Sequence, residues 1–334
     1  MPNPARALVI GSTGHIGSHV VRALLAEGTA VRAWHRSTPR LDTLAGLDVE
    51  RVQGDTADRA QLTAALRGCA WLFQCGGYYP FGQQPRDAAV QAGVQNVRDV
   101  LEAARAAAVE RVVFTSSAAT NRRVAGRAGT EADAEPYPPS APRSLYATVK
   151  IAMEQEALRF AREGLPVVFL NPSVCLGEYD TKPFSGLMLF PVAKWRLPVY
   201  LQHQFSAVYT GDVGRAAVAA ARRGRQAERY LLAAQNVTYL DFTRLVARLA
   251  GVRPPWLPVP YPVAWATAAV TELIGRLTRT PPAIPLHAVV ATKHRETLDG
   301  SKVMRELGLI YTPLDEAIRR ALAWFRQVGL LPSR

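Results

Sequence analysis

The two residues best suited to chemistry in this sequence are Tyr146 and Lys150, four positions apart. Residues four apart lie on one face of a helix, so a phenol would lie beside an ammonium group. A nearby cation favours phenolate, which makes the tyrosine a usable proton donor and acceptor near neutral pH. Reducing a carbonyl or oxidising an alcohol needs such a group beside the carbon that exchanges a hydride. Alone, the pair fits a surface tyrosine and lysine on an amphipathic helix better than a reactive site, so its meaning depends on the elements that would position it.

A glycine-rich turn near the start of the chain is the first of these elements. The short apolar run 5–10 leads into Gly11, and Gly14 and Gly17 follow at three-residue spacing before a helix pattern that ends at Gly28. A strand, a glycine turn and a helix in this order hold a dinucleotide pyrophosphate against the free N–H groups and positive dipole of the helix N-terminus. The residues expected to contact the cofactor here are Gly11, Thr13, Gly14 and Ile16.

The second expected strand, 30–34, bears on which dinucleotide binds. Enzymes that prefer NAD usually have an acid at the end of this strand, where it binds the ribose hydroxyls. Here His35, Arg36 and Ser37 follow the strand, and the next acid is Asp42. A guanidinium suits a 2′-phosphate, so Arg36 favours NADP(H), with NAD(H) as the alternative. Arg36 can also simply cover the adenine or face solvent.

Two further strands, expected at 49–53 and 70–75, end in residues suited to the same cofactor. Asp55 can accept a hydrogen bond from the adenine amino group. It can equally cap the next helix, as Thr56 and Asp58 can. Gly76 follows the second of these strands, where the backbone must approach the cofactor closely. Asp55, Thr56 and Gly76 are therefore predicted to bind the cofactor.

Strands that alternate with helices predict an α/β fold, a Rossmann-type doubly wound parallel sheet with helices on both faces. The strand at 111–115 has Ser116 and Ser117 at its tip. Because the carboxyl ends of parallel strands share one edge, Ser117 and Tyr146 are expected to meet over the nicotinamide. An aromatic loop with Tyr78, Tyr79 and Phe81 lies at the same edge, where ligands bind in such folds.

The expected domain organisation has two parts. Residues 1–170 form the dinucleotide-binding domain, and 206–234 return to it through strands at 206–209 and 229–233 that rejoin the sheet. Residues 171–205 and 235–334 form a smaller, mostly helical substrate lobe.

Several local motifs together resemble the extended short-chain dehydrogenase/reductase family, that is, the NAD-dependent epimerase/dehydratase type, over nearly the whole chain. The motifs are the glycine turn, Asp55, Asn96, Thr115-Ser116-Ser117 and Tyr146-x-x-x-Lys150. The most similar branch holds dihydroflavonol reductase-like proteins, 3β-hydroxysteroid dehydrogenase-like proteins and hopanoid-associated sugar epimerases. That placement rests on three segments, 31–36, Asn171-Pro172-Ser173 and the tail 301–325.

The resemblance implies an oxidoreductase and gives roles to single residues. Tyr146 is implied as the acid/base. Lys150 would bind the nicotinamide ribose and lower the tyrosine pKa, and Ser117 would hydrogen-bond the substrate oxygen, with Ser116 as the alternate. Pro172 and Ser173 would line the nicotinamide. His15 stands where the family often has an aromatic residue and can approach the pyrophosphate, whereas Asn96 matches a structural position.

The expected lining of the substrate site is apolar. Phe184 and Met188 face Tyr78, Tyr79 and Phe81 in this interpretation, although more than half of the aromatic residues nearby are expected in the core. Such a lining suits a hydrophobic secondary alcohol or ketone with a ring system, sterol-like or hopanoid-like, since a nucleotide-sugar site should show more polar and arginine clamps. The alternatives are an NAD-dependent sugar-nucleotide epimerase or dehydratase and a non-catalytic cofactor-binding protein.

Charge and composition limit the partners. The net charge is +13 and the pI about 10.1, but the basic residues are scattered, which argues against nucleic acid. The helix expected at 262–278 has an apolar stripe that suits core packing; the stretch 256–277 can also rest on a membrane surface. Three cysteines without metal-ligand spacing suit a reducing cytoplasm and no metal site. The family resemblance also implies a homodimer through helices 87–107 and 144–163.

Overall fold

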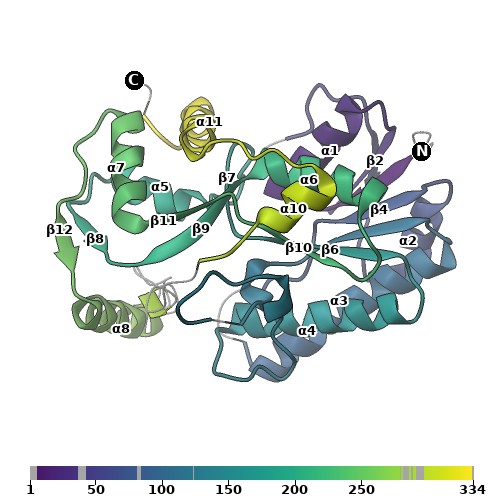
Figure 1. Ribbon diagram of the computed structural model, residues 1–334, viewed down its shortest axis with the longest axis horizontal. Helices are drawn as coiled ribbons and strands as arrows, with labels where there is room; N and C mark the ends of the chain where they lie inside the picture. The colour runs from purple at the N-terminus through teal and green to yellow at the C-terminus, as the bar shows by residue number, and fades with distance from the viewer. Residues whose placement is uncertain are drawn as a thin grey trace.

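A seven-stranded parallel sheet forms the centre of the protein (Figure 1). The computed structural model describes residues 6–36, 43–80, 84–122, 124–278, 280, 286, 289–290 and 297–332. The strand order is β10-β6-β5-β4-β1-β2-β3, and every neighbouring pair is parallel. The strands are β1 (Ala7–Ile10), β2 (Val31–His35), β3 (Glu50–Gln53), β4 (Trp71–Gln74), β5 (Arg111–Thr115), β6 (Val167–Pro172) and β10 (Arg229–Leu232). The predicted Rossmann-type sheet is confirmed.

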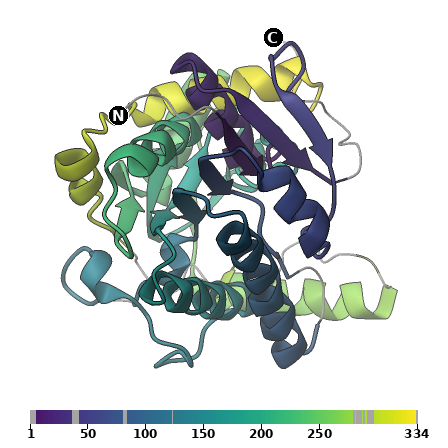
Figure 2. The ribbon, with the colours of Figure 1, turned by 90° about the vertical axis from the view of Figure 1, so that its right-hand side faces the viewer.

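Helices cover both faces of this sheet, and the views in Figures 1 and 2 place them in layers on either side of the strands. Strands buried on both faces need near-continuous apolar sequence, and β1 and β4 are buried along their whole length. One hydrophobic core lies under α2 (Arg59–Leu66), α3 (Arg86–Ala106) and α4 (Leu145–Arg162). The other lies under α1 (His15–Ala26), α6 (Thr210–Arg223) and α10 (Ser301–Leu307).

The substrate lobe has its own core and two small sheets. The first sheet holds β7 (Val174–Leu176), β9 (Gln204–Tyr209) and β11 (Gln235–Thr238). The second pairs β8 (Val199–Leu201) with β12 (Leu257–Val259). The helices are α5 (Gly186–Ala193), α7 (Tyr239–Ala250), α8 (Tyr261–Thr278) and α11 (Leu314–Gln327). Two short 3₁₀ turns, η1 (Ala118–Thr120) and η2 (Glu131–Asp133), follow β5.

The structure corrects two of the expected boundaries. Strand β10 joins the main sheet beside β6 as predicted, but β9 pairs with β7 and β11 in the small sheet instead of rejoining the large one. A short apolar strand fits either sheet, so its sequence does not decide between them. In addition, α10 packs against α6 and β10, and Val303 and Leu307 are buried in the core of the nucleotide-binding body. The segment 235–334 is therefore divided between the two bodies.

Helix α8 has the reverse of the usual amphipathic arrangement. Its buried side consists of small residues, Ala264, Ala268 and Gly275, whereas Val270, Leu273, Ile274 and Leu277 are exposed. The apolar stripe of the sequence thus faces outward, because short alanine side chains let this helix lie close to Leu201, Val259 and Leu286. In both views α8 lies at the edge of the molecule (Figures 1 and 2).

Candidate functional site

The glycine turn after β1 forms a tight cradle. Gly11 has a φ of +74°, and a Cβ there would lie 2.6 Å from the Cα of Gly76. A Cβ at Gly17 would lie 2.1 Å from the carbonyl oxygen of Gly11, so only glycine fits either place. Gly14 is the N-cap of α1 and provides no side-chain cap, which leaves the first N–H groups of the helix available. The cradle therefore fits an anionic pyrophosphate.

The other predicted residues of this turn differ in their surroundings. The carbonyl of Thr13 accepts a hydrogen bond from Thr43 at 3.1 Å, and Ile16 packs partly buried against the core. The His15 ring is turned toward α6, with Nε2 2.8 Å from Thr210 Oγ1 and Nδ1 3.9 Å from Asp180. Burial lowers the pKa of His15, against the opposing effect of Asp180. A contact between His15 and a pyrophosphate would thus use its backbone N–H.

The adenosine end of the predicted site lies at β2 and β3. Arg36 is exposed directly after β2, while Ser37 and Asp42 are outside the described residues. Asp55 is also exposed, and its Oδ1 accepts the N–H of Ala57 at 3.0 Å.

The two neighbouring polar residues, Thr56 and Asp58, have different roles. Asp58, and not Asp55 or Thr56, caps α2 by accepting the N–H of Gln61 at 2.9 Å. Thr56 Oγ1 accepts a hydrogen bond from Asn96 at 2.9 Å, which links the turn to α3 and gives Asn96 its expected structural place. Asp55 is thus not needed as the helix cap.

Ser117, Tyr146 and Lys150 come together at the carboxyl edge of the sheet. Ser144 caps α4 by accepting the N–H of Ala147 at 3.2 Å, which places Tyr146 in the first turn. Ser117 lies close enough to the Tyr146 phenol to favour its ionised form, and Lys150 Nζ lies 6.0 Å from the centre of the tyrosine ring. Ser116 instead donates to Glu154, so Ser117 is the serine that faces the tyrosine.

Burial governs the ionisation of this group. It raises the pKa of Tyr146 to about 12, although the neighbouring Ser117 acts to lower it. It also lowers the pKa of Lys150 to about 8, against the opposing effect of the Glu154 carboxylate. The expected lowering of the tyrosine pKa by Lys150 is not seen in the chain alone, because burial disfavours phenolate more strongly. At neutral pH Tyr146 is a phenol that can donate a proton.

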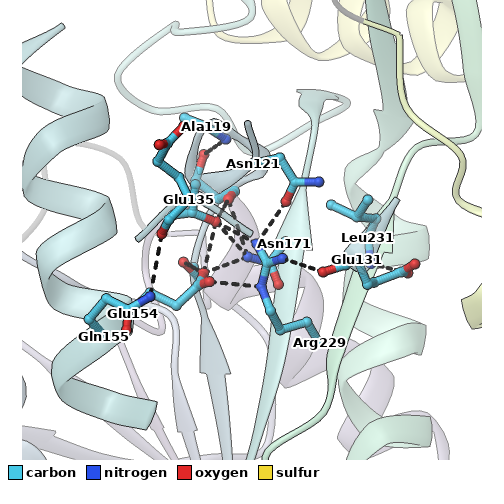
Figure 3. A network of polar contacts seen from close by, with 12 residues as sticks. Ala119, Asn121, Glu131, Glu135, Glu154, Gln155, Asn171, Arg229 and Leu231 are labelled. Carbon is cyan, nitrogen blue, oxygen red and sulfur yellow. Dashed lines mark hydrogen bonds and ion pairs between the residues drawn. The ribbon is translucent and has the colours of Figure 1, made fainter. Parts of the chain in front are cut away.

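A buried polar network lies behind these residues (Figure 3). Its centre is Glu154, one turn beyond Lys150 on α4. Glu154 accepts hydrogen bonds from Ser116, from Asn171 at 2.6 Å and from Thr120 at 2.9 Å. Arg229 on β10 pairs with it at 2.8 Å. The network joins α4 to the tips of β5 and β6 and so fixes the turn that holds Ser117.

Arg229 extends the network toward the loop after β5. Its guanidinium donates to Asn121 Oδ1 at 2.7 Å, to Thr120 Oγ1 at 2.8 Å and to the Glu131 carbonyl at 2.9 Å. Sequence reasoning missed both Glu154 and Arg229. A signal for Glu154 was present, because an acid four positions after Lys150 lies on the same helix face as the reactive pair.

Pro172 and Ser173, at the end of β6, are the residues predicted to line the nicotinamide. The Ser173 N–H donates to the Leu232 carbonyl at 3.0 Å. Its Oγ is buried and has no hydrogen-bond partner among the described residues, so it is available to form a hydrogen bond with a polar group of a ligand. On the opposite side, a Cβ at Gly77 would lie 3.5 Å from Lys150 Nζ. The open N-terminus of α1 and the unpaired Ser173 oxygen together fit a nicotinamide dinucleotide.

Of the five predicted substrate residues, Tyr79 lies beside Tyr146 and Phe184 lies beside Tyr79. The ring of Tyr79 is 5.0 Å from that of Tyr146 and 5.2 Å from that of Phe184. Tyr78 packs against the core and hydrogen-bonds Gln84, and Met188 packs against the core of the substrate lobe. Phe81 lies outside the described residues. The aromatic side of the site thus consists of Tyr79 and Phe184.

A hollow on the protein surface lies away from these residues. It measures about 440 Å³, opens between α1 and α11 and is lined in part by Arg22, Glu178 and Arg320. None of the predicted catalytic residues lines it.

Comparison with known proteins agrees with this geometry. Residues 7–233 match the model of the NAD dependent epimerase/dehydratase family. A Synechocystis protein that carries a dihydroflavonol 4-reductase name is 30% identical, and the alignment covers 98% of this chain and 96% of that protein. Sterol demethylase protein B of Methylococcus capsulatus is also 30% identical, with 97% and 99% covered.

A solved structure agrees over the whole length. A nucleoside-diphosphate-sugar epimerase from Pseudomonas aeruginosa has a TM-score of 0.80 at 29% identity, covering 98% of this chain and 99% of that one. The family match spans the glycine cradle, the predicted catalytic residues and the sheet that positions them. The chain therefore belongs to the NAD dependent epimerase/dehydratase family and is an NAD(P)-dependent oxidoreductase.

Proposed function

We propose that this protein interconverts a secondary alcohol and a ketone on a hydrophobic, ring-containing substrate such as a sterol-like or hopanoid-like lipid. The observation that carries this proposal is the half-buried Tyr146, a phenol at neutral pH, with Ser117 near its hydroxyl and the tilted ring of Tyr79 5.0 Å away. A proton donor with an aromatic wall suits a carbonyl on an apolar ring. The aromatic wall offers little to bind a charged phosphate or a sugar.

A nicotinamide held by the glycine cradle and Ser173 would supply the hydride that reduces the carbonyl carbon. Ser117 holds the carbonyl oxygen by a hydrogen bond, and Tyr146 transfers its phenolic proton to that oxygen. Lys150, protonated below its pKa of about 8, binds the nicotinamide ribose and stabilises the phenolate that remains. Ketone, hydride and proton together give the alcohol, and oxidation reverses each transfer.

The similarity to sterol demethylase protein B supports a lipid substrate, since the two chains correspond over nearly their whole lengths. The exposed Arg36 after β2 supports NADP(H) over NAD(H), because a guanidinium can pair with a 2′-phosphate. Substitution Arg36→Ala is expected to raise the KM for NADPH about tenfold, equivalent to one charged hydrogen bond, and to leave the KM for NADH nearly unchanged.

A second candidate is a sugar-nucleotide epimerase that retains NAD⁺ through a closed redox cycle. The similarity to the Pseudomonas aeruginosa nucleoside-diphosphate-sugar epimerase favours it. The same tyrosine and serine would serve, but the cofactor would be neither consumed nor released.

The deciding experiment assays cofactor-depleted protein with cyclic ketones, sterol-like ketones and nucleotide sugars, each with NADPH and with NADH. Stoichiometric oxidation of NADPH by a hydrophobic ketone is the expected result. Conversion of a nucleotide sugar without net NADPH consumption, together with NAD⁺ that copurifies with the protein, would instead support the epimerase.

A further inference from the structure

The exposed apolar residues of the substrate lobe gather on one part of its surface, here called the apolar face. It consists of the loop 194–199, the segment 253–257 that lies against it, and the outer side of α8. The two loops are joined because the N–H groups of Trp256 and Leu257 both donate to the Pro198 carbonyl at 2.9 Å. Trp256 is 72% exposed and Leu277 77%. The other large exposed apolar residues of the apolar face are Trp195, Leu197, Val199, Leu257, Val263, Trp265, Val270, Leu273 and Ile274.

Aromatic rings extend from the reactive edge as far as Phe184, and exposed or aromatic residues of α5 follow it toward the apolar face. The Tyr79 ring lies 5.0 Å from that of Tyr146 and 5.2 Å from that of Phe184, which is exposed just before α5. Along α5, Leu187 is exposed, and Phe190 lies 6.3 Å from Trp195 on the apolar face. An apolar molecule held by the face would therefore have a largely apolar route to Tyr146.

Cations outnumber acids around the apolar face, and Glu272 on α8 is the one acid in the sequence segments 194–199, 253–257 and 261–278. Between Asp180 and Asp212 the sequence has three cations, Lys182, Lys194 and Arg196, and no acid. Between Asp241 and Glu272 it again has three cations, Arg244, Arg248 and Arg253, and no acid. Lys194, Arg196 and Arg253 are exposed directly beside the tryptophans. A surface that offers apolar contact and negative charge together is complementary to this arrangement.

An anionic lipid bilayer has both properties. Tryptophan suits the boundary between headgroups and acyl chains, because its ring is apolar and its N–H is polar. A helix with an apolar outer side lies in the plane of the interface, and α8 has that form. None of the helices among the described residues is long and apolar enough to cross a bilayer. The face thus fits contact with a membrane from one side.

We propose that the apolar face docks the protein on an anionic membrane, where the substrate lobe takes its lipid substrate directly from the bilayer. The delivery of substrate rests on the proposed function, since a water-soluble substrate would not need it. The docking itself rests on the exposed residues and their charge.

The test is flotation of the full-length protein with vesicles of phosphatidylcholine alone and of phosphatidylcholine with about one third phosphatidylglycerol. The wild type is expected to float with the anionic vesicles and much less with the neutral ones. The double substitution Lys194→Gln/Arg196→Gln should weaken binding to anionic vesicles about 30-fold. Leu273→Gln/Leu277→Gln should weaken it at least tenfold.

The matched control is Ile310→Gln, which changes an equally exposed apolar residue (81%) between α10 and α11, away from the apolar face. It should bind vesicles as the wild type does. The proposal is overturned if the wild type stays unbound, or if the face variants bind as tightly as the control. It is also overturned if light scattering without vesicles finds a wild-type dimer and a monomeric Leu273→Gln/Leu277→Gln variant, since a second copy would then cover the face.

A parallel assay separates this proposal from the proposed function. Each variant is assayed without vesicles on a water-soluble cyclic ketone with NADPH, and turnover at the wild-type rate is expected because the face is remote from Tyr146. Vesicle binding without any ketone turnover would contradict the proposed function alone. Ketone turnover without vesicle binding would contradict the docking alone.

Discussion

Behind Tyr146, Glu154 and Arg229 are almost entirely enclosed and hydrogen-bonded to several strands, whereas on the far side of the substrate lobe α8 turns Leu273 and Leu277 outward. The first region uses polar groups where apolar ones are usual, and the second does the reverse. Buried polar groups that are well satisfied fix one geometry, because each displaced partner leaves an unpaired group. Exposed apolar groups impose no single geometry, and they leave water only when a binding partner covers them. The proton-transfer edge is thus held rigidly, whereas the outer lobe has the exposed apolar groups that the proposed membrane docking requires.

The largest effect is expected at the proton-transfer edge itself, at the Tyr146 hydroxyl. Substitution Tyr146→Phe should lower turnover about 1,000-fold, because it removes the proton donor and leaves the ring. The melting temperature and the binding of NADPH, followed by its fluorescence, should change little. Tyr79→Phe is the matched control and should keep most of the activity, since its ring still stacks. Wild-type turnover by Tyr146→Phe would contradict the assigned mechanism.

The buried polar network can be disrupted at Arg229. Substitution Arg229→Met should reduce the free energy of unfolding by about 3–5 kcal/mol, because the Glu154 carboxylate loses its counter-charge. Arg319→Met is the control: it removes an exposed arginine paired with Asp315, and should cost less than about 1 kcal/mol. Chemical denaturation measures both.

A double variant separates an unpaired charge from a mere loss of packing. Glu154→Leu with Arg229→Met removes both charges and should be less destabilised than Arg229→Met alone. If the double variant is instead the less stable, the network contributes net stability beyond charge compensation. The kcat of Glu154→Gln, with KM unchanged, would then report how far the network positions Ser117.

Changes of pH should act on activity and stability in opposite directions through Lys150. Its pKa in the folded chain is about 8, below the 10.5 of the unfolded chain, so the folded state binds fewer protons between these values. The contribution of this group to stability therefore rises as pH increases from about 8 to 10.5. Its charge, needed for the proposed reaction, is lost over the same range. A kcat/KM that stays level from pH 7 to 10, with Lys150→Arg behaving identically, would contradict this.

The smallest effect is expected on the exposed side. Leu273→Gln/Leu277→Gln should change the free energy of unfolding by no more than about 0.5 kcal/mol per site, since these side chains bury little area in the isolated protein. Thermal denaturation without vesicles measures it, with Ala268→Gln as a contrasting variant on the buried side of the same helix. A large loss of stability in the leucine variants would mean that the apolar face is already covered.

The sequence was sufficient for those features that depend on neighbours along the chain. The alternation of strands and helices predicted the parallel sheet, and the glycine spacing predicted the cradle, because both depend on local backbone requirements. The choice between Ser116 and Ser117 needed the structure, since it depends on Glu154 beneath the strand tip. The pair Glu154 and Arg229 was missed because 75 residues separate them and only the fold brings them together.

The error at α8 has a different cause. Periodicity reveals that a helix has an apolar side, but not that small residues on the opposite side pack more closely against the lobe. Ala264 and Ala268 have little hydrophobicity and so gave no signal, yet they form the contact. The roles of the predicted cofactor and substrate residues stay predictions, because their partners are ligands and no property of the chain alone tests them.

The return of α10 to the nucleotide-binding body has a practical consequence for protein engineering. Val303, Leu307 and Leu309 complete a core built mostly from residues before 233, and Lys302 donates to the Arg229 carbonyl at 2.9 Å. A fragment cut at the end of the family match would leave that core open. Exchange of substrate lobes between relatives would therefore require grafting three separate inserts, one before α6, one between β10 and α10 and one after α10, with α6, β10 and α10 kept from the recipient.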